Sequence, residues 1–223
     1  MPADFAPRRF RFVVFDWDGT LADSTAIIAS ALQSACRDVG EPVPDEVSAR
    51  YVIGLGLGDA LRQVAPRLPP ARYPELSARS REHFLARDPD IPLFDGVREL
   101  LAALDAAGYL LGIATGKSRI GLDRSLSKQG LAHHFVATRC ADEGFPKPNP
   151  DMLLHLMDRV GVDPRQTLMI GDTTHDLDLA RNAGVAAVAV AYGAHDHEGL
   201  DAGAPLATVH SVRELAAWLL THG

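Results

Sequence analysis

The stretch Phe12-Val13-Val14-Phe15-Asp16-Trp17-Asp18-Gly19-Thr20 decides the fold. Its first four residues are aromatic or β-branched, which is typical of a strand buried on both faces. Asp16 and Asp18 follow the strand directly, and Gly19 allows the chain to turn. Ligands bind at the carboxyl ends of strands in open α/β sheets, and two unpaired carboxylates there need a compensating cation or substrate. A site is therefore expected at this strand end, although an Asp-rich turn without function is the alternative that this stretch alone leaves open.

Strands and helices alternate along the chain after Pro92. Four further strands are predicted at residues 109–114, 135–138, 167–170 and 185–191. Helices are predicted between them and after the last of them. Such alternation indicates right-handed βαβ units, and hence a parallel sheet that is covered on both faces. The sequence therefore predicts an α/β fold with five parallel strands.

The segment between the first strand and Pro92 has no strand pattern. Apolar spacing predicts helices near residues 27–35, 47–52, 59–65 and 71–87. A glycine-rich break at residues 54–58 and three prolines interrupt them. We therefore expect an all-helical insertion of about 70 residues, a size compatible with a small domain. The predicted domains are a core of residues 1–21 plus 93–223 and a helical domain of residues 22–92.

Composition limits the classes of partner. The 223 residues carry a net charge of −7, which argues against nucleic acid or an anionic membrane as the main partner. The two cysteines form no CxxC pattern, and we expect them to be reduced thiols. No apolar run is long enough to span a bilayer and the first residues lack a signal-peptide pattern, so a cytoplasmic location is expected. An anionic substrate would need local cations to offset the overall negative charge.

Groups suited to phosphoryl transfer follow three of the predicted strands, and one more lies in a loop. Asp16 and Asp18 follow the first strand, Thr115 and Gly116 end the second, and further groups come later: Lys147 between two prolines, and Asp172 and Asp176 after the fourth strand. Mg²⁺ prefers a few carboxylates together with water and substrate phosphate oxygens. A lysine acts as a point charge on phosphate, and hydroxyl and backbone N–H groups complete such a cradle. The ordered set predicts a site for a hard cation and an anion.

The set resembles the haloacid dehalogenase (HAD) superfamily in its phosphatase branch, over roughly residues 12–220. The motifs that carry the resemblance are Asp16-x-Asp18-Gly19-Thr20, Thr115-Gly116, Lys147-Pro148 and Gly171-Asp172-x-x-x-Asp176. The inserted helices look like a C1 cap, and their start and glycine-rich stretch are most similar to phosphoglycolate phosphatase-like members. The resemblance implies a Rossmann-like parallel five-stranded core, the HAD fold, with an inserted all-helical cap.

The resemblance also implies residue roles. Asp16 would be the nucleophile that forms an aspartyl-phosphate, and Asp18 would be the general acid and then the general base. Mg²⁺ would be held by Asp16, the backbone carbonyl of Asp18, Asp172 and, through water or by orienting the ligands, Asp176. Thr115, Gly116 and Lys147 would bind the transferring phosphoryl group. The second Asp of the first motif favours cleavage of a phosphate ester or anhydride over dehalogenation.

Substrate choice is expected to lie in the cap. Arg50 and Arg62 are candidates for binding a carboxylate or second anion of the substrate, with solvated helix residues as the equally open alternative. His195 and His197 follow the fifth strand, where a surface loop is expected rather than a metal site.

The function expected is Mg²⁺-dependent hydrolysis of a small phosphate monoester, with 2-phosphoglycolate the leading candidate. The alternatives are a phosphosugar mutase similar to β-phosphoglucomutase, a pyrophosphatase, and a binding protein that has kept the fold and lost activity. The partner expected is therefore a small phosphorylated metabolite, and the sequence leaves the oligomeric state open.

Overall fold

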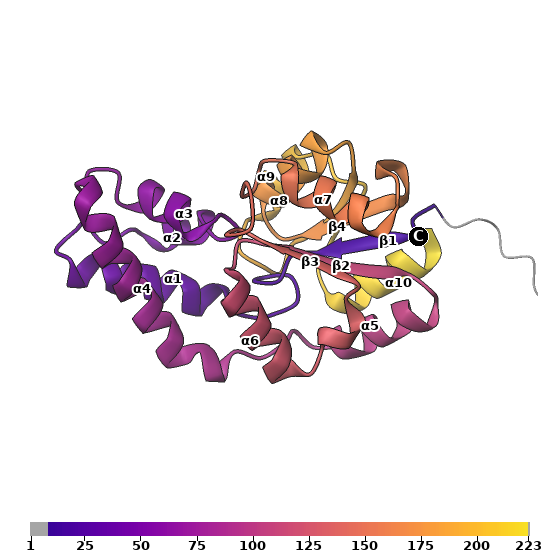
Figure 1. Ribbon diagram of the computed structural model, residues 1–223, viewed down its shortest axis with the longest axis horizontal. Helices are drawn as coiled ribbons and strands as arrows, with labels where there is room; N and C mark the ends of the chain where they lie inside the picture. Colours follow the sequence, from indigo (N-terminus) through magenta and orange to yellow (C-terminus); the bar gives the residue numbers. More distant parts are fainter. Residues whose placement is uncertain (1–8, 223) are drawn as a thin grey trace, which may run out of the picture.

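Strand β1 (Phe12–Phe15) lies inside a six-stranded parallel sheet in the computed structural model, which describes residues 9–222. The strand order is β3-β2-β1-β4-β5-β6, so β1 pairs with both β2 and β4 (Figure 1). The other strands are β2 (Leu110–Thr115), β3 (Ala137–Cys140), β4 (Thr167–Gly171), β5 (Ala186–Val190) and β6 (Thr208–Val209). This architecture confirms the predicted α/β class.

The predicted number of five strands is wrong by one. β6 has only two residues and pairs with the end of β5. A segment of two residues is too short to show the period-2 alternation by which strands are recognised in a sequence.

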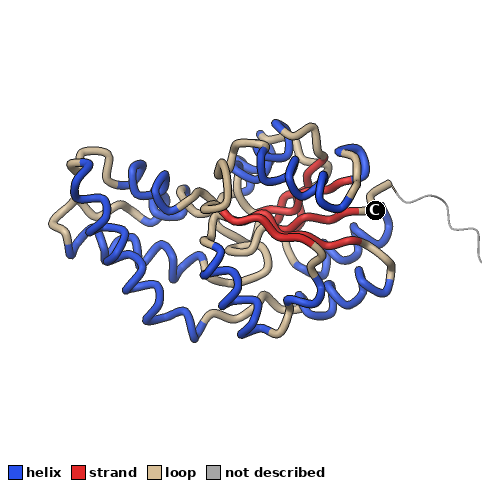
Figure 2. Tube along the Cα trace, in the orientation of Figure 1, coloured by secondary structure: helices blue, strands red, loops and turns tan. Residues whose placement is uncertain are grey.

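Helices cover both faces of the sheet, as Figure 2 shows. Val13 and Phe15 of β1 pack on one side, against an apolar cluster that includes α5 (Val97–Ala106), α6 (Arg119–Gln129) and α10 (Val212–His222). Phe12 and Val14 face the opposite side, which is covered by α7 (Asp151–Val160) and α8 (Thr174–Asn182). A short helix, α9 (His197–Ala202), packs beside α8. The uninterrupted apolar sequence of β1 follows from this burial on two sides.

Four α-helices form an arm that extends away from the sheet, drawn in purple in Figure 1. They are α1 (Thr25–Asp38), α2 (Glu46–Tyr51), α3 (Leu57–Val64) and α4 (Tyr73–Arg87). The arm has an apolar cluster of its own, in which Leu32, Leu61 and Leu76 are buried. This arm, the cap, corresponds to the predicted all-helical insertion. Four short 3₁₀ segments complete the chain: Pro70–Arg72, Asp88–Asp90, Ala132–His134 and Pro164–Gln166.

Two chain segments that run side by side connect the cap to the sheet. Ala22 bridges to Leu93, the Asp23 N–H donates to the Pro92 carbonyl at 3.0 Å, and the Phe94 N–H donates to the Leu21 carbonyl at 3.1 Å. On this pairing we propose the domain division into residues 22–92 and the remainder; residues 1–8 and 223 lie outside the described part. No helix among the described residues has both the length and the apolar character needed to cross a bilayer.

Candidate active site

Three buried carboxylates meet where β1 and β4 end. Asp16 follows β1, while Asp172 and Asp176 follow β4, and each side chain offers an oxygen within 4.8 Å of the others. All three residues are fully buried. The two strands are neighbours in the sheet, so their carboxyl ends bring together residues that are far apart in the sequence.

One ammonium group lies among these carboxylates. Lys147, from the segment between β3 and α7, places Nζ 2.9 Å from Asp16 Oδ1 and 2.6 Å from Asp176 Oδ1. Burial raises the pKa of Asp16 to about 7, although Lys147 acts in the opposite direction. Burial also raises the pKa of Asp172. Burial alone would lower the pKa of Lys147, but Asp16 and Asp176 outweigh it and raise that pKa. Three carboxylates face a single ammonium, so the cluster keeps a surplus of negative charge.

The arrangement fits a hard divalent cation. Both carboxylate oxygens of Asp16 are buried; Oδ1 has only the ion pair with Lys147, and Oδ2 has no hydrogen-bond partner among the described residues. Asp172 accepts bonds from Thr20 Oγ1 at 2.9 Å and from the Ala194 N–H at 2.7 Å, which fix its orientation. A buried carboxylate oxygen without a partner is costly without a cation, and oxygen ligands of this kind suit Mg²⁺. Asp16, Asp172 and Asp176 are therefore the residues that could hold it.

Two glycines allow other residues of the site to approach the backbone closely. Gly19 has a φ of +84°, and a Cβ there would lie 2.1 Å from Asp172 Oδ2. A Cβ at Gly116 would lie 2.5 Å from the Leu55 carbonyl oxygen of the cap. The turn after β1 and the end of β2 thus need residues without side chains, the first to admit Asp172 and the second to admit the cap loop.

Asp18 is not one of the three clustered carboxylates. Its Oδ1 accepts a hydrogen bond from Ser24 Oγ at 2.7 Å, and its two oxygens lie 2.9 and 3.0 Å from Lys117 Nζ. Ser24 occupies the N-cap position of α1, but its side chain makes no cap hydrogen bond. The hydroxyl of Ser24 binds Asp18 instead. The predicted metal contact of the Asp18 backbone carbonyl stays a prediction.

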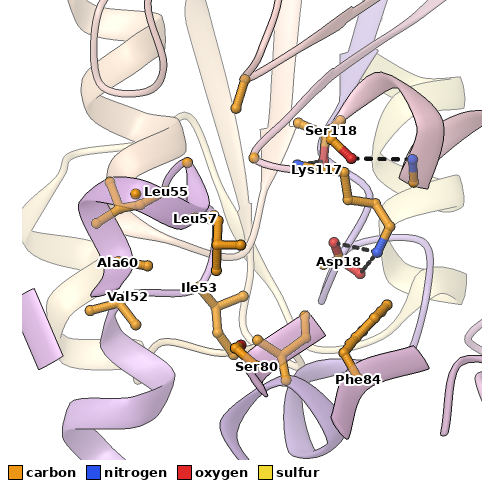
Figure 3. A pocket seen from close by; sticks show the side chains of 18 of the residues that line it. Asp18, Val52, Ile53, Leu55, Leu57, Ala60, Ser80, Phe84, Lys117 and Ser118 are labelled. Carbon is orange, nitrogen blue, oxygen red and sulfur yellow. Dashed lines mark hydrogen bonds and ion pairs between the residues drawn. The ribbon is translucent and has the colours of Figure 1, made fainter. Parts of the chain in front are cut away.

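A cavity of about 690 Å³ lies between the cap and the sheet (Figure 3). Asp16, Asp18, Thr115 and Gly116 line its floor, so the predicted groups at the ends of β1 and β2 share one space. Apolar residues of the cap, including Ile53, Leu57 and Phe84, line the opposite wall. Thr115 is buried, and its Oγ1 accepts a hydrogen bond from the Lys117 N–H at 3.2 Å.

The two arginines predicted to bind substrate differ in position. Arg62 lines the cavity, but its side chain is 63% exposed and pairs with Asp59 at 2.6 Å. Arg50 is not among the lining residues; it binds Glu46 at 2.7 Å and Thr25 Oγ1 at 3.2 Å. The geometry therefore favours only Arg62 as a residue that could reach a ligand.

His195 makes a contact between cap and core that the sequence did not predict. We expected this residue in a surface loop, yet it is buried, and its Nε2 lies 3.0 Å from the Tyr51 carbonyl oxygen of the cap. His175 Nε2 reaches the same oxygen at 2.8 Å. The Thr174 N–H donates to His195 Nδ1, so Nε2 carries the hydrogen and donates to Tyr51. Burial lowers the pKa of His195, which favours this neutral form.

Lys117 is the other functional candidate that sequence reasoning missed. The signal was its position directly after Thr115-Gly116, at the end of a central strand, where a basic side chain can reach the ligand.

Comparison with known proteins gives the family. Residues 13–190 match the sequence model described as haloacid dehalogenase-like hydrolase. The chain belongs to this family. The resemblance predicted from the motifs is confirmed, and so is the expected enzyme class, a phosphatase.

Individual relatives agree with this assignment. The probable phosphatase IndB of Dickeya dadantii is 39% identical over 210 residues, covering 91% of this chain and 90% of the relative. The phosphoglycolate phosphatase of Vibrio vulnificus is 34% identical over 224 residues, covering 93% and 95%. A predicted phosphatase of Clostridium acetobutylicum has a similar structure, with a TM-score of 0.84 at 25% identity, covering 95% of this chain and 99% of the other.

Proposed function

We propose that this protein is a Mg²⁺-dependent phosphatase that hydrolyses small phosphate monoesters through an aspartyl-phosphate on Asp16. The observation that carries the proposal is the buried Asp16 carboxylate, whose Oδ1 pairs with Lys147 and whose Oδ2 has no hydrogen-bond partner among the described residues, beside two further carboxylates. The unpaired oxygen is available to attack phosphorus.

The reaction divides between Asp16 and Asp18. An oxygen of Asp16 attacks phosphorus, the bond to the ester oxygen breaks, and Asp18 gives its proton to that oxygen as the alcohol leaves. In the second step Asp18 accepts a proton from the water that attacks the phosphoryl group. Inorganic phosphate leaves and the Asp16 carboxylate is restored. Asp18 Oδ1 lies 2.9 Å from Lys117 Nζ, so a basic side chain stands beside the proposed acid and base.

Other residues position the phosphoryl group. In this proposal the Lys147 ammonium and the end of β2, at Thr115 and Gly116, bind the phosphoryl group and stabilise the charge that develops on its oxygens. Bound Mg²⁺ supplies positive charge that offsets the repulsion between the phosphate and the carboxylates. The cap closes the cavity from the other side and keeps bulk water out.

The leading substrate candidate is 2-phosphoglycolate. Support comes from the Vibrio vulnificus relative, whose name is phosphoglycolate phosphatase, with 34% identity over nearly the whole length of both chains. A small phosphorylated metabolite also agrees with a site whose cations, Lys147 and Lys117, are local while the whole chain is negatively charged.

Phosphate release from a panel of phosphate esters tests the function. The panel contains 2-phosphoglycolate, several sugar phosphates including β-glucose 1-phosphate, and diphosphate, each assayed with Mg²⁺ and with EDTA. We expect phosphate release that depends on Mg²⁺ and is fastest with 2-phosphoglycolate. Interconversion of the sugar phosphates without phosphate release would establish the mutase instead, and preferential cleavage of diphosphate would establish a pyrophosphatase. Undiminished activity in EDTA would contradict the metal assignment.

A further inference from the structure

A single lysine stands next to the proposed proton donor, inside the cavity. Lys117 follows the end of β2, and its Nζ lies 2.9 and 3.0 Å from the two oxygens of Asp18. Its side chain is only 9% exposed. The ammonium also lies 4.7 Å from the ring centre of Phe84, which comes from α4 of the cap (Figure 3). Lys117 therefore spans the gap between core and cap at the point where the alcohol leaves.

The ammonium has binding capacity that these contacts do not use. A lysine has three N–H donors, and two are directed at the Asp18 oxygens. The face of Phe84 attracts the positive charge and restricts its position without taking a donor. One donor remains, beside a cavity whose cap side includes apolar residues such as Ile53, Leu57 and Phe84.

The other cations that line the cavity are worse placed to bind a ligand. Arg124 pairs with Asp88 at 2.8 Å and is 40% exposed, and Arg62 pairs with Asp59. Arg81 is exposed to solvent. Charge in contact with bulk water is screened, so these side chains give little selectivity. Among the described residues that line the cavity, Lys117 is the cation shielded from solvent, and it lies beside Asp18. Lys147 is paired with the carboxylate cluster instead.

We propose that Lys117 binds an anionic group on the leaving part of the substrate and thereby selects phosphate esters whose alcohol carries a carboxylate. The inference rests on the proposed phosphatase function. The ester oxygen must lie close to Asp18 to receive its proton. A carboxylate separated from that oxygen by one carbon then lies within reach of an ammonium 3 Å from Asp18. Lys117 thus binds the leaving alcohol through its carboxylate, while Lys147 binds the phosphoryl group.

The test compares two esters that differ only in the group that Lys117 would bind. 2-Phosphoglycolate has a carboxylate where 2-hydroxyethyl phosphate has a neutral CH₂OH group. The quantity measured is the ratio of kcat/KM for the two esters, in the wild type, Lys117→Gln, Lys117→Arg and Arg124→Gln. This ratio cancels any equal loss that Lys117→Gln causes by disturbing Asp18.

We expect the wild type to prefer 2-phosphoglycolate. Loss of a hydrogen bond to a charged group should lower this preference about 10- to 100-fold in Lys117→Gln, mainly through KM. Lys117→Arg should restore much of it because the positive charge is kept. Arg124→Gln, on the same cavity wall, should keep the wild-type ratio.

Equal losses for both esters in Lys117→Gln would overturn the inference and leave the phosphatase function standing. Equal turnover of the two esters by the wild type would likewise overturn the inference about Lys117 and leave the phosphatase function standing. Release of phosphate from neither ester, nor from any other ester of the panel, would overturn the proposed function and the inference with it.

Discussion

Asp16 is surrounded by more negative charge than its single ammonium partner offsets. Asp172 and Asp176 share the buried cluster, and among the described residues Lys147 alone is paired with it. Burial of a carboxylate without full compensation favours its protonated form, which is why the pKa of Asp16 rises to about 7. In the proposed function the same imbalance favours a divalent cation, so that metal binding and proton binding would compete at one place.

The first prediction concerns stability in the absence of metal. The pKa of Asp16 rises from 3.8 to about 7 on folding, so the unfolded chain loses this proton first as the pH increases. The Asp16 contribution to the free energy of unfolding is therefore intact below about pH 4 and is lost progressively up to about pH 7. Urea unfolding in EDTA should show Asp16→Asn gaining stability relative to the wild type over this range, by a few kcal/mol at about pH 7.

Added Mg²⁺ provides the control for this effect. At about pH 7 it should stabilise the wild type and reduce its difference from Asp16→Asn, because the cation binds the folded cluster only. A stability difference between the two proteins that stays constant with pH would contradict the raised pKa of the buried Asp16 carboxylate.

A second prediction concerns Asp18. The Asp18→Asn change keeps an acceptor for Ser24 and Lys117 and removes the transferable proton. We expect kcat for phosphate esters to fall about 10²- to 10⁴-fold, the usual contribution of general acid–base catalysis. Steady-state kinetics on 2-phosphoglycolate would measure this, with circular dichroism to show that the fold is kept. A kcat within a few-fold of the wild type would exclude Asp18 as the acid and base.

Secondary structure could be predicted where the sequence pattern is long enough. β1 was predicted with its observed bounds because its four apolar residues are followed at once by two carboxylates and a glycine. β6 and α9 were missed because two and six residues carry too little periodicity. Short elements of this kind form because the sheet edge and α8 are already in place to pack against.

The candidate site was predictable only in part, for a physical reason. Motif residues stand at strand ends, and the parallel order of the strands brings them together without further information. The partners of Ser24 and Lys117 depend on a tertiary contact with Asp18, which no local pattern reveals. Local propensity predicts a different role for Ser24, because a serine directly before a helix usually caps it with its side chain.

A third prediction concerns the contact between α2 and the core. The Tyr51 carbonyl accepts bonds from His175 and His195, and the His195 ring stacks on Tyr51 at 5.0 Å. His195→Phe keeps an aromatic ring but removes the donor to Tyr51 and the acceptor for Thr174. Because the half-buried N–H of Thr174 then lacks this partner and the bond to Tyr51 is lost, we expect the free energy of unfolding to fall by about 1–3 kcal/mol in urea titrations.

His197 offers a matched control for that change, because its side chain is 52% exposed. His197→Phe should alter the free energy of unfolding by about 0.5 kcal/mol or less. Equal effects of the two substitutions would mean that the buried hydrogen bonds of His195 do not fasten the cap.

The molecule as a whole consists of a sheet with its helices and a cap, each with apolar clusters of its own. The carboxylates and Lys147 lie beyond the carboxyl ends of the sheet strands, and two paired segments connect the sheet to the cap. The cavity lies between the two parts and is lined by residues of both. In the proposed function the chemistry therefore belongs to the sheet, and the choice of alcohol belongs to the boundary with the cap.

The overall charge of −7 is compatible with an anionic substrate for the same reason. The cations that matter are few, buried and placed by the fold: Lys147 within the carboxylates and Lys117 beside Asp18. In a site shielded from water, such charges act more strongly than the distant surface acids, which solvent and salt screen.

The most direct test of the central claim is the rate of phosphate release from 2-phosphoglycolate by Asp16→Asn, measured with Mg²⁺ beside the wild type and Asp123→Asn. Asp123 is an exposed carboxylate paired with Arg119 outside the cavity, so the control makes the same chemical change elsewhere. If Asp16 forms the covalent intermediate, its variant should be slower than the wild type by about 10³-fold or more, while Asp123→Asn keeps the wild-type rate. Phosphate release by Asp16→Asn at the wild-type rate would contradict the account.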